Sequence, residues 1–325
     1  MGEFELIERY FRSTARQLER GDVVLGIGDD AAVLDMPAGQ QLVAALDTLV
    51  EGRHFPAGCA PRSIGHRALA VNLSDLAAMG ADPAWCLLAL TMPAAEESFL
   101  DAFASGLSEL ALRHGVALIG GDTTGGPLAV SLQALGFVSP GQALRRDGAS
   151  PGDLLYVSGT PGDAAAGLAL LQHAGFASTD VHREYLLQRF LYPEPRVELG
   201  RALRGLASAC IDVSDGLAAD AHKLAIASGG GALIDAARLP LSDALAGVMG
   251  VERAMTLALT GGDDYELCFT VPASRRAELE ARLDNVKCRV TCIGSIGTQS
   301  GLFVTHHGAD LHCDTQGYDH FRTSG

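Results

Sequence analysis

The stretch that decides how this chain folds lies at residues 68–79 and runs Ala68-Leu69-Ala70-Val71-Asn72-Leu73-Ser74-Asp75-Leu76-Ala77-Ala78-Met79. It predicts a helix over 61–79 that is apolar nearly all round, as in helices buried on most sides. Asp75 is the one charge in this stretch, and a buried carboxylate without a partner is costly. We therefore predict that Asp75 binds a metal ion. The alternative is a carboxylate that accepts hydrogen bonds from neighbouring backbone amides.

Other acidic residues stand where an apolar run stops and glycine or a turn begins. The segments are Gly26-Ile27-Gly28-Asp29-Asp30, Asp47-Thr48, Gly120-Gly121-Asp122-Thr123-Thr124, Asp212-Val213-Ser214-Asp215-Gly216 and Gly261-Gly262-Asp263-Asp264-Tyr265. Carboxylates at the ends of buried strands would converge on a shared cleft, where they repel each other unless a cation lies between them. Mg²⁺ prefers oxygen ligands and is commonly bound together with phosphate. The pattern therefore predicts a magnesium site that handles phosphate. For Asp30, Asp47 and Asp122 taken singly, a turn or helix cap is the alternative.

Composition and charge limit the kind of partner. The 325 residues suffice for two domains, and 48% hydrophobic residues with 19% charged ones indicate a well-packed globular protein. A net charge of −15 argues against a nucleic-acid partner. The only lysines are Lys223 and Lys287, and neither follows glycine, which excludes a Walker A loop. Any nucleotide chemistry must then use metal ions, backbone amides and arginine.

Cysteine usage and the N-terminal region predict a cytoplasmic protein. The seven cysteines form no Cys-x-x-Cys pair, and several lie in apolar runs, which is typical of reduced buried thiols. The first 20 residues contain acidic residues and predict an amphipathic helix instead of a signal peptide, with its apolar face at Phe4, Ile7, Tyr10 and Phe11. Uninterrupted apolar runs fall short of the roughly 18 residues of a membrane helix, so no membrane span is expected.

The order of elements predicts an α+β fold with two domains. In the first part, strands are predicted at 23–27, 31–34, 42–47, 85–91, 116–119 and 128–138, with helices over 61–79 and near 96–114. Residues 139–152 are rich in glycine and proline and predict a linker between an N-terminal domain (1–138) and a C-terminal domain (153–325). Beyond the linker, a strand at 153–158, a helix at 161–173, more helix to about 207 and a strand ending at Asp212 are expected.

Five further candidates have ordinary alternatives. Arg146, in the predicted linker, could clamp a polyphosphate or simply be a solvated loop arginine. Asp215, at a strand-to-helix junction, could bind an ion or cap the helix. The segment 158–163 resembles a phosphate cradle, although strand–helix turns without ligands look the same. His54 could be a packed histidine, and Tyr318 a core or stacking residue.

Taken together, the motifs resemble the bacterial type of thiamine-monophosphate kinase, in the superfamily of aminoimidazole ribonucleotide synthetase and selenophosphate synthetase. The resemblance spans almost the whole chain. It is carried by Gly-Glu-Phe-Glu-Leu-Ile at 2–7, Gly-Ile-Gly-Asp-Asp at 26–30, Asp-Thr-Leu-Val-Glu-Gly-Arg-His-Phe at 47–55, Ala-Val-Asn-Leu-Ser-Asp-Leu-Ala-Ala-Met-Gly-Ala-Asp-Pro at 70–83, Ile-Gly-Gly-Asp-Thr-Thr at 119–124, Asp-Val-Ser-Asp-Gly-Leu at 212–217, Gly-Gly-Asp-Asp-Tyr-Glu-Leu at 261–267 and Gly-Tyr-Asp-His-Phe at 317–321.

This resemblance implies phosphorylation of thiamine monophosphate to thiamine diphosphate by ATP, with several Mg²⁺ ions. It implies a homodimer that pairs through the N-terminal sheets, with the site between the two α+β domains. The implied metal ligands are Asp30, Leu46 through its carbonyl, Asp47, Asp75, Asp122, Asp212 and Asp215. The implied ATP contacts are Gly121, Asp122, Arg146 and Ser214. The implied thiamine contacts are His54, Asp263 and Tyr318. Catalysis would rest on Asp75, Asp122 and Arg146.

The chain departs from the family pattern at four positions, and two rival functions stay open. Ala45 and Leu46 replace residues that are often hydroxylic, Gly125 stands where arginine is common, and Asp263 replaces a more frequent glutamate. One rival is a catalytically silent regulator that binds a nucleotide or thiamine phosphate. The other is a different ATP-dependent synthetase of the same superfamily.

Overall fold

The computed structural model describes residues 3–12, 15, 18, 20–172, 181–313 and 317, without the side chains of residues 3 and 4. The chain divides into two compact units. Unit 1 comprises Met1–Leu76 and Ala81–Gly141, and unit 2 comprises Ala77–Gly80 and Gln142–Gly325. Each unit combines a β-sheet with helices, which confirms the α+β class. The predicted domain limits, 1–138 and 153–325 with a linker between them, stay a prediction.

Unit 1 is built on a four-stranded mixed sheet in the order β3-β6-β4-β5. Its strands are β3 (Gln41–Val50), β4 (Asp82–Met92), β5 (Ala117–Gly125) and β6 (Ala129–Val138). β6 pairs antiparallel with β3 and β4, whereas β4 and β5 run parallel. A separate antiparallel pair consists of β1 (Val23–Leu25) and β2 (Val33–Leu34). The predicted strands of this region are confirmed, with β3, β4 and β5 longer than predicted and β1 and β2 shorter.

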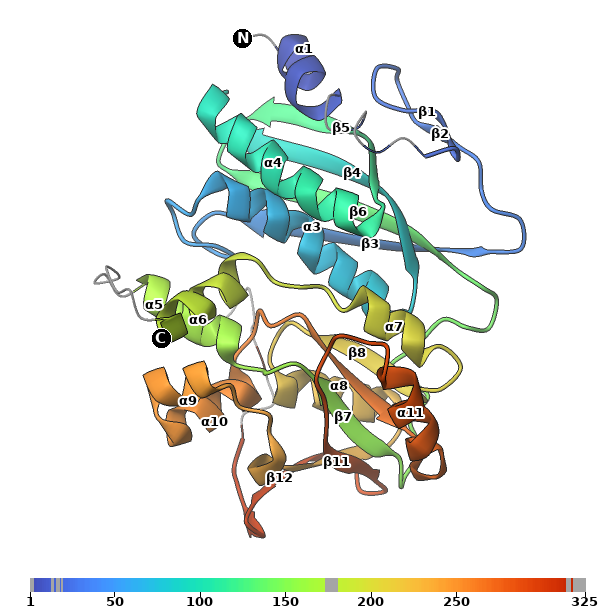
Figure 1. Cartoon of the computed structure of the whole chain (residues 1–325), viewed down its shortest axis with the longest axis vertical. Coiled ribbons are helices and arrows are strands. Elements are labelled where there is room, and N and C mark those ends of the chain that lie inside the picture. Colours follow the sequence, from blue (N-terminus) through green and yellow to red (C-terminus); the bar gives the residue numbers. More distant parts are fainter. Residues whose placement is uncertain are drawn as a thin grey trace. The chain divides into compact units, whose positions relative to one another are not determined.

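Two long helices, α3 (Pro61–Ala78) and α4 (Glu97–His114), cross the same face of this sheet (Figure 1). Leu69, Leu73 and Leu76 of α3 are fully buried, as the apolar sequence predicts. Side chains alternate between the two faces of a strand. On β3, the alternation leaves Leu42 48% exposed and Leu46 64% exposed. One face of the sheet therefore forms the core, and the other carries exposed apolar side chains.

The N-terminal segment forms a short helix, α1 (Glu3–Leu6), followed by a π-helical turn, η1 (Ile7–Arg12). Tyr10 and Phe11 are buried, which confirms the predicted apolar face at these two residues. The wider π-helical winding was not predicted. None of the helices that the structure describes has the length and apolarity required to cross a membrane.

Unit 2 contains a seven-stranded mixed sheet in the order β13-β12-β9-β11-β7-β10-β8. Its strands are β7 (Leu154–Ser158), β8 (Ala209–Val213), β9 (Gly231–Asp235), β10 (Glu266–Val271), β11 (Val290–Gly297), β12 (Gly301–His306) and β13 (Ala309–Asp310). β10 lies between β7 and β8 and is antiparallel to both. Every residue of β8 and β10 is buried, so this end of the sheet is covered although β8 is its edge strand.

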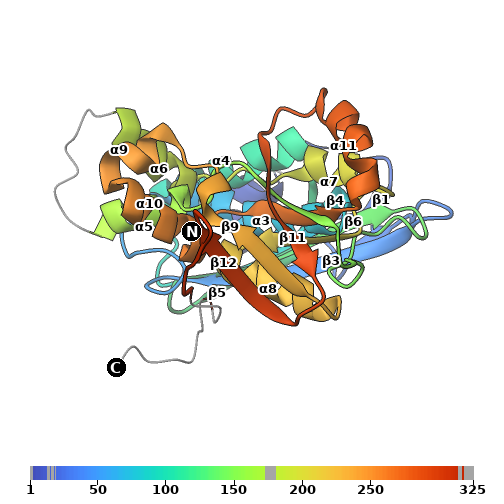
Figure 2. The ribbon, with the colours of Figure 1, turned by 90° about the horizontal axis from the view of Figure 1, so that it is seen from below.

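The helices of unit 2 pack in two places. They are α5 (Asp163–Gln172), α6 (Val181–Leu191), α7 (Val197–Leu203), α8 (Leu217–Ala227), α9 (Asp243–Met249), α10 (Val251–Thr260) and α11 (Arg276–Leu283), with 3₁₀ turns η2 (Ala236–Arg238) and η3 (Ala273–Arg275). Figure 2 shows α8 beside β9 and β12. Helices α5, α6, α9 and α10 form a group of their own around Leu186 and Leu245, in both views (Figures 1 and 2).

Candidate active site

Two carboxyl groups meet in unit 1. Asp47 lies on β3, Asp75 lies near the end of α3, and a hydrogen bond joins their side chains. Burial raises the pKa of Asp47, while the hydrogen bond to Asp75 and the nearby His54 act in the opposite direction. Two carboxyl groups in contact must share a proton or hold a cation between them. One partner of Asp75 is therefore a second acid, and a cation between the two would relieve their repulsion.

His54 lies beside this pair. Its Nδ1 accepts a hydrogen bond from the backbone N–H of Val50, at 3.0 Å. This bond assigns the proton of the neutral ring to Nε2. The side chain is only partly buried, and the ring in its protonated form would act to lower the pKa of Asp47. His54 is therefore a neighbour of the carboxyl pair and not a histidine enclosed in the core.

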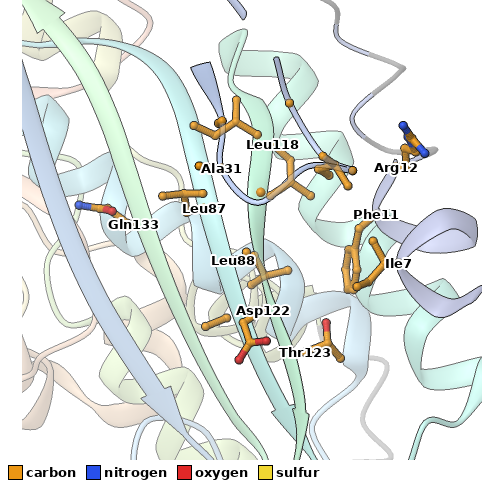
Figure 3. A pocket seen from close by; sticks show the side chains of 18 of the residues that line it. Ile7, Phe11, Arg12, Ala31, Leu87, Leu88, Leu118, Asp122, Thr123 and Gln133 are labelled. Carbon is orange, nitrogen blue, oxygen red and sulfur yellow. The ribbon is translucent and has the colours of Figure 1, made fainter. Parts of the chain in front are cut away.

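A cavity of about 1110 Å³ opens in the same unit, between the N-terminal segment, the loop at 26–32 and the sheet (Figure 3). Four predicted site residues line it, namely Asp30, Leu46, Gly121 and Asp122. Ile7, Phe11 and Leu118 contribute an apolar part of the wall. The cavity thus has an acidic part and an apolar part, which suits a ligand with a charged end and a flat apolar end.

Asp29 and Asp30 are neighbours in the 26–32 loop, but their side chains lie in different surroundings. The side chain of Asp29 accepts the backbone N–H of Asp30 at 2.8 Å, which is an ordinary turn interaction. The side chain of Asp30 is exposed and lines the cavity. Gly121 has φ of 152°, and a Cβ there would lie 1.8 Å from the carbonyl oxygen of Leu88. Only glycine fits this position, so the glycine of the 119–124 motif has a structural cause.

The donors present in unit 1 fit a hard cation that is shared with phosphate. Within the described ranges, no three His, Cys, Asp or Glu side chains lie close enough together to hold one ion. The carboxyl pair of Asp47 and Asp75 supplies two oxygen ligands. Mg²⁺ is usually bound by one or two carboxylates, with water and substrate phosphate completing its shell, instead of by a closed protein cage. The carboxyl pair of Asp47 and Asp75 would supply the protein ligands of such a shell.

In unit 2, the predicted residues of the 212–216 motif lie at the end of β8. Asp212 is buried within the strand, and Ser214 and Asp215 follow it in the turn. The N-cap of α8 is Gly216 and makes no side-chain cap bond, so the interpretation of Asp215 as an ordinary cap is wrong. Asp220, inside the helix, instead accepts the backbone N–H groups of Ser214 and Asp215, each at 3.0 Å. The Asp215 side chain is left available for another cation.

In the described structure that cation is Lys223. Its Nζ lies 2.5 Å from Oδ2 of Asp215 and 2.8 Å from Oδ1 of Asp220. Asp220 is almost fully buried, and burial raises its pKa while Lys223 acts to lower it. The sequence carries a signal for Asp220, since it stands three positions before Lys223 in a helix whose other residues, apart from His222, are apolar.

The segment that carries Asp263 lies directly against this turn. The backbone N–H of Asp263 donates to the carbonyl oxygen of Ser214 at 2.9 Å, and that of Tyr265 donates to Val213 at 2.9 Å. The hydroxyl of Tyr265 donates to Oδ1 of Asp263 at 3.2 Å. The predicted ATP contact Ser214 and the predicted thiamine contact Asp263 are therefore on touching segments.

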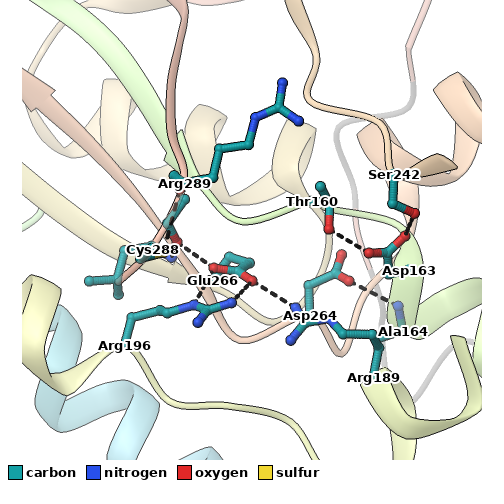
Figure 4. A network of polar contacts seen from close by, with 12 residues as sticks. Thr160, Asp163, Ala164, Arg189, Arg196, Ser242, Asp264, Glu266, Cys288 and Arg289 are labelled. Atoms are coloured by element: carbon teal, nitrogen blue, oxygen red, sulfur yellow. Dashed lines mark hydrogen bonds and ion pairs between the residues drawn. The ribbon is translucent and has the colours of Figure 1, made fainter. Parts of the chain in front are cut away.

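The turn at 158–163 is not a phosphate cradle. The carboxylate of Asp264 accepts the backbone N–H groups of Gly162 and Ala164, at 2.6 and 3.1 Å (Figure 4). Asp163 accepts bonds from Thr160, Tyr185 and Ser242. Protein carboxylates thus fill the positions that a phosphate would need, and the alternative of a plain strand–helix turn is correct.

A buried ionic cluster underlies this turn. Glu266 is fully buried and pairs with Arg189 at 2.7 Å and with Arg196 at 2.5 Å, while the hydroxyl of Ser158 donates to it at 2.5 Å (Figure 4). Burial raises the pKa of Glu266, but Arg196 and Arg189 more than offset this and hold it below the usual range. This cluster was missed in the sequence, although a glutamate at the head of the apolar run 267–271 is an available signal.

Two predicted residues are less informative. The side chain of Arg146 is exposed in a loop of unit 2, and its carbonyl oxygen accepts the hydroxyl of Ser228 at 3.0 Å. The neighbouring Arg145 pairs with Asp147 at 2.5 Å. Tyr318 lies outside the described residues. The role of each predicted site residue stays a prediction, and so does a site between the two domains.

Comparison with known proteins matches this geometry to one family. Residues 28–138 match the N-terminal domain of AIR synthase related protein, and residues 150–307 match its C-terminal domain. Thiamine-monophosphate kinase of Escherichia coli strain K12 is 50% identical over 323 residues, which cover 99% of each chain.

Solved structures agree in both fold and length. Thiamine-monophosphate kinase from Stenotrophomonas maltophilia K279a has a TM-score of 0.87 at 49% identity, covering 96% of this chain and 98% of its own. AaThiL complexed with AMPPCP and TMP has a TM-score of 0.78 at 33% identity, covering 98% and 97%. Because identity extends over the full length of both sequence and fold, this chain belongs to the thiamine-monophosphate kinase family.

Proposed function

We propose that this chain is a thiamine-phosphate kinase, which transfers the γ-phosphoryl group of ATP to thiamine monophosphate and yields ADP and thiamine diphosphate. The observation that carries the proposal is the contact between the carboxyl groups of Asp47 and Asp75. It lies in a chain that is 50% identical over nearly its whole length to a thiamine-monophosphate kinase. Magnesium-dependent phosphoryl transfer needs carboxylate ligands for its metal ions, and this pair can supply two of them.

The acceptor is itself a phosphate, which decides what the protein has to do. A phosphate monoester is already anionic, so the reaction needs no strong general base. The obstacle is repulsion between two anions, and several Mg²⁺ ions, when bound, would supply charge screening and orientation. The proposed ligands are Asp30, the carbonyl of Leu46, Asp47, Asp75, Asp122, Asp212 and Asp215. The protein's own contribution is to hold both phosphate groups in line for direct transfer.

For ATP we propose contacts from Gly121, Asp122, Arg146 and Ser214. Gly121 lets the backbone approach the ligand closely, and Arg146 would add a planar donor fork to a polyphosphate. Asp75, Asp122 and Arg146 would surround the reacting groups. The apolar part of the unit 1 cavity, at Ile7, Phe11 and Leu118, has the character that a nucleobase requires.

For thiamine monophosphate we propose His54, Asp263 and Tyr318. Asp263 offers a carboxylate to an N–H donor, and His54 stands beside the carboxyl pair where the phosphate acceptor would arrive. This set discriminates the enzyme from a phosphate-binding protein of general specificity, because it addresses the heterocyclic part of the substrate.

We further propose that the protein is a homodimer and acts in the cytoplasm. The face of the unit 1 sheet opposite α3 and α4 carries Leu42 and Leu46, which are 48% and 64% exposed. Contiguous exposed apolar strand residues are typical of a surface that a second copy covers. All seven cysteines are free, which suits a reducing compartment.

The test is ADP release coupled to thiamine monophosphate. Purified protein with ATP and Mg²⁺ should release ADP only when thiamine monophosphate is added, with thiamine diphosphate formed in equal amount. EDTA should abolish the reaction. Binding of both ligands without ADP release would instead favour the silent regulator, for which the exchanges at Ala45, Leu46 and Gly125 are the motivating observation.

A further inference from the structure

The segment around Asp263 has an unusual backbone. Among the described residues other than glycine, positive φ occurs at Asp263 (69°), Tyr265 (51°) and His307 (50°). Two of these three therefore lie two positions apart in one segment. A left-handed conformation costs roughly 1–2 kcal/mol for a residue with a side chain, and a bulky tyrosine is seldom found there. Such strain persists where the surrounding structure fixes it, and it concentrates at functional positions.

Strong contacts hold the strained segment on both sides. The backbone N–H groups of Asp263 and Tyr265 bond to the turn after β8. Between them, the carboxylate of Asp264 bonds to the start of α5, and immediately after them Glu266 is held by its two arginines (Figure 4). The backbone of Asp263 is therefore fixed, and what remains to be set is the direction of its side chain.

The hydroxyl of Tyr265 sets that direction. It donates to Oδ1 of Asp263 at 3.2 Å, and only 9% of the Tyr265 side chain is exposed. A hydrogen bond to one carboxylate oxygen restricts the rotation of the whole carboxylate and therefore also the direction of its second oxygen, Oδ2.

We propose that Tyr265 is a positioning residue, which orients the carboxylate of Asp263 toward the exocyclic amine of the aminopyrimidine ring of the substrate. The inference rests on the proposed function and deepens it, since it names the residue that fixes one substrate contact. The side chain of an aspartate is short, so its direction decides which group of the substrate the carboxylate of Asp263 can reach. Tyr265 acts through Asp263 and does not touch the substrate.

The first test is Tyr265→Phe, which removes one oxygen atom and keeps the buried ring. The expected result is a rise of about three- to tenfold in KM for thiamine monophosphate, the effect of one hydrogen bond. KM for ATP and kcat should stay within about twofold. A purely structural role would lower stability or change both KM values together, and that result would overturn the proposal.

Tyr156→Phe is the matched control. Tyr156 is also a buried tyrosine of unit 2, and its hydroxyl has no hydrogen-bond partner among the described residues. Loss of this hydroxyl should leave both KM values unchanged. An equal rise in KM in both variants would show that the effect does not come from the contact with Asp263.

A double-mutant cycle decides whether Tyr265 acts through Asp263. Asp263→Ala should raise KM for thiamine monophosphate more than Tyr265→Phe does. Addition of Tyr265→Phe to Asp263→Ala should then cause no further rise, because the side chain that Tyr265 orients is absent. Fully additive effects would mean that the two residues act independently and would overturn the inference.

The same measurements separate this inference from the proposed function. If the wild-type protein turns over and Tyr265→Phe matches it in KM, the inference fails and the function stands. If the wild-type protein binds thiamine monophosphate in calorimetry without turnover, the function fails, and the ratio of Kd values between wild type and Tyr265→Phe still tests the inference. A wild-type protein that does neither overturns both.

Discussion

Asp47 and Asp75 in unit 1 meet carboxyl to carboxyl, whereas Glu266 in unit 2 is enclosed by Arg189 and Arg196. In the same unit, Lys223 bridges Asp215 and Asp220. In unit 1 two acidic side chains thus contact each other, whereas in unit 2 arginine and lysine side chains pair with the acidic ones. The difference separates acidic residues that need an external ion from acidic residues that hold the fold together.

The position of each group relative to solvent supports this division. Asp30 and Asp122 are exposed and line a cavity, while Glu266 and Asp264 are completely enclosed. An acidic residue that binds an incoming ion has to be reachable. An acidic residue that holds a strained turn in place has to be immobile and shielded from solvent. Four predictions follow this contrast, and each would weaken it if it failed.

The largest effect is expected for Glu266→Ala. It would leave two buried arginines without their partner, and breaking a buried ion pair in this way costs about 3–5 kcal/mol of unfolding free energy. Urea unfolding followed by circular dichroism measures it. The control is Glu280→Ala, which removes an exposed i,i+4 pair with Arg276 and should cost less than about 0.5 kcal/mol. Similar losses of unfolding free energy in the two variants would show that the cluster around Glu266 has no special role in stability.

Asp75→Asn should affect catalysis more than stability. Removal of one charge of the carboxyl pair is expected to lower kcat at least ~100-fold, which corresponds to a few kcal/mol of transition-state stabilisation. Steady-state ADP release with saturating thiamine monophosphate measures it. Asp101→Asn, on the exposed side of α4, is the control and should be fully active. A near-normal rate for Asp75→Asn would exclude Asp75 from the mechanism.

Lys223→Met should strengthen metal binding in unit 2. The Nζ of Lys223 competes for Asp215, and a partly exposed ion pair is worth up to about 1 kcal/mol, so Mn²⁺ affinity should rise roughly fivefold. Calorimetric titration with Mn²⁺ measures the change. Lys287→Met removes the other lysine of the chain and should leave the affinity unchanged. Weaker binding in Lys223→Met would show that Asp215 depends on the lysine for its position.

The remaining prediction concerns pH. Burial raises the pKa of Asp264 to about 8. The folded state therefore keeps a proton that the unfolded chain releases near pH 4, so the stabilisation from this group is complete below about pH 4 and is lost as pH rises toward 8. The Tm of the wild type should fall more steeply between pH 6 and pH 8 than that of Asp264→Asn, whose amide cannot ionise. Parallel curves would contradict the assignment.

Much of the fold could be predicted from the sequence, because the spacing of apolar residues indicates which side of a helix or strand is buried. The unbroken apolar run around Asp75 predicted α3, and apolar strands with glycine at their ends predicted the edges where the acidic motifs lie. The π-helical winding of 7–12 could not be predicted, since the apolar spacing of Ile7, Tyr10 and Phe11 is also that of an α-helix.

The site was predicted only in part, for a physical reason. The pairing of Asp47 with Asp75 joins a strand to a distant helix, and the sequence could suggest but not specify such a contact. Glu266 was missed because the arginines that neutralise it lie at least 70 residues away in the chain. Asp220 and Lys223 were missed although they pair with each other within one helix. The turn at 158–163 resembled a phosphate cradle in sequence. Its amide groups are instead bonded by Asp264, about a hundred residues later in the chain.

The most direct measurement is Mn²⁺ binding to the protein in the absence of nucleotide, followed by electron paramagnetic resonance. Wild-type protein and the double variant Asp47→Asn/Asp75→Asn would be compared, with circular dichroism as the check that both are folded. We predict that the wild type binds Mn²⁺ and that the variant loses the tightest site. Equal binding by the two proteins would contradict the claim that this carboxyl pair is where the enzyme holds its metal ion.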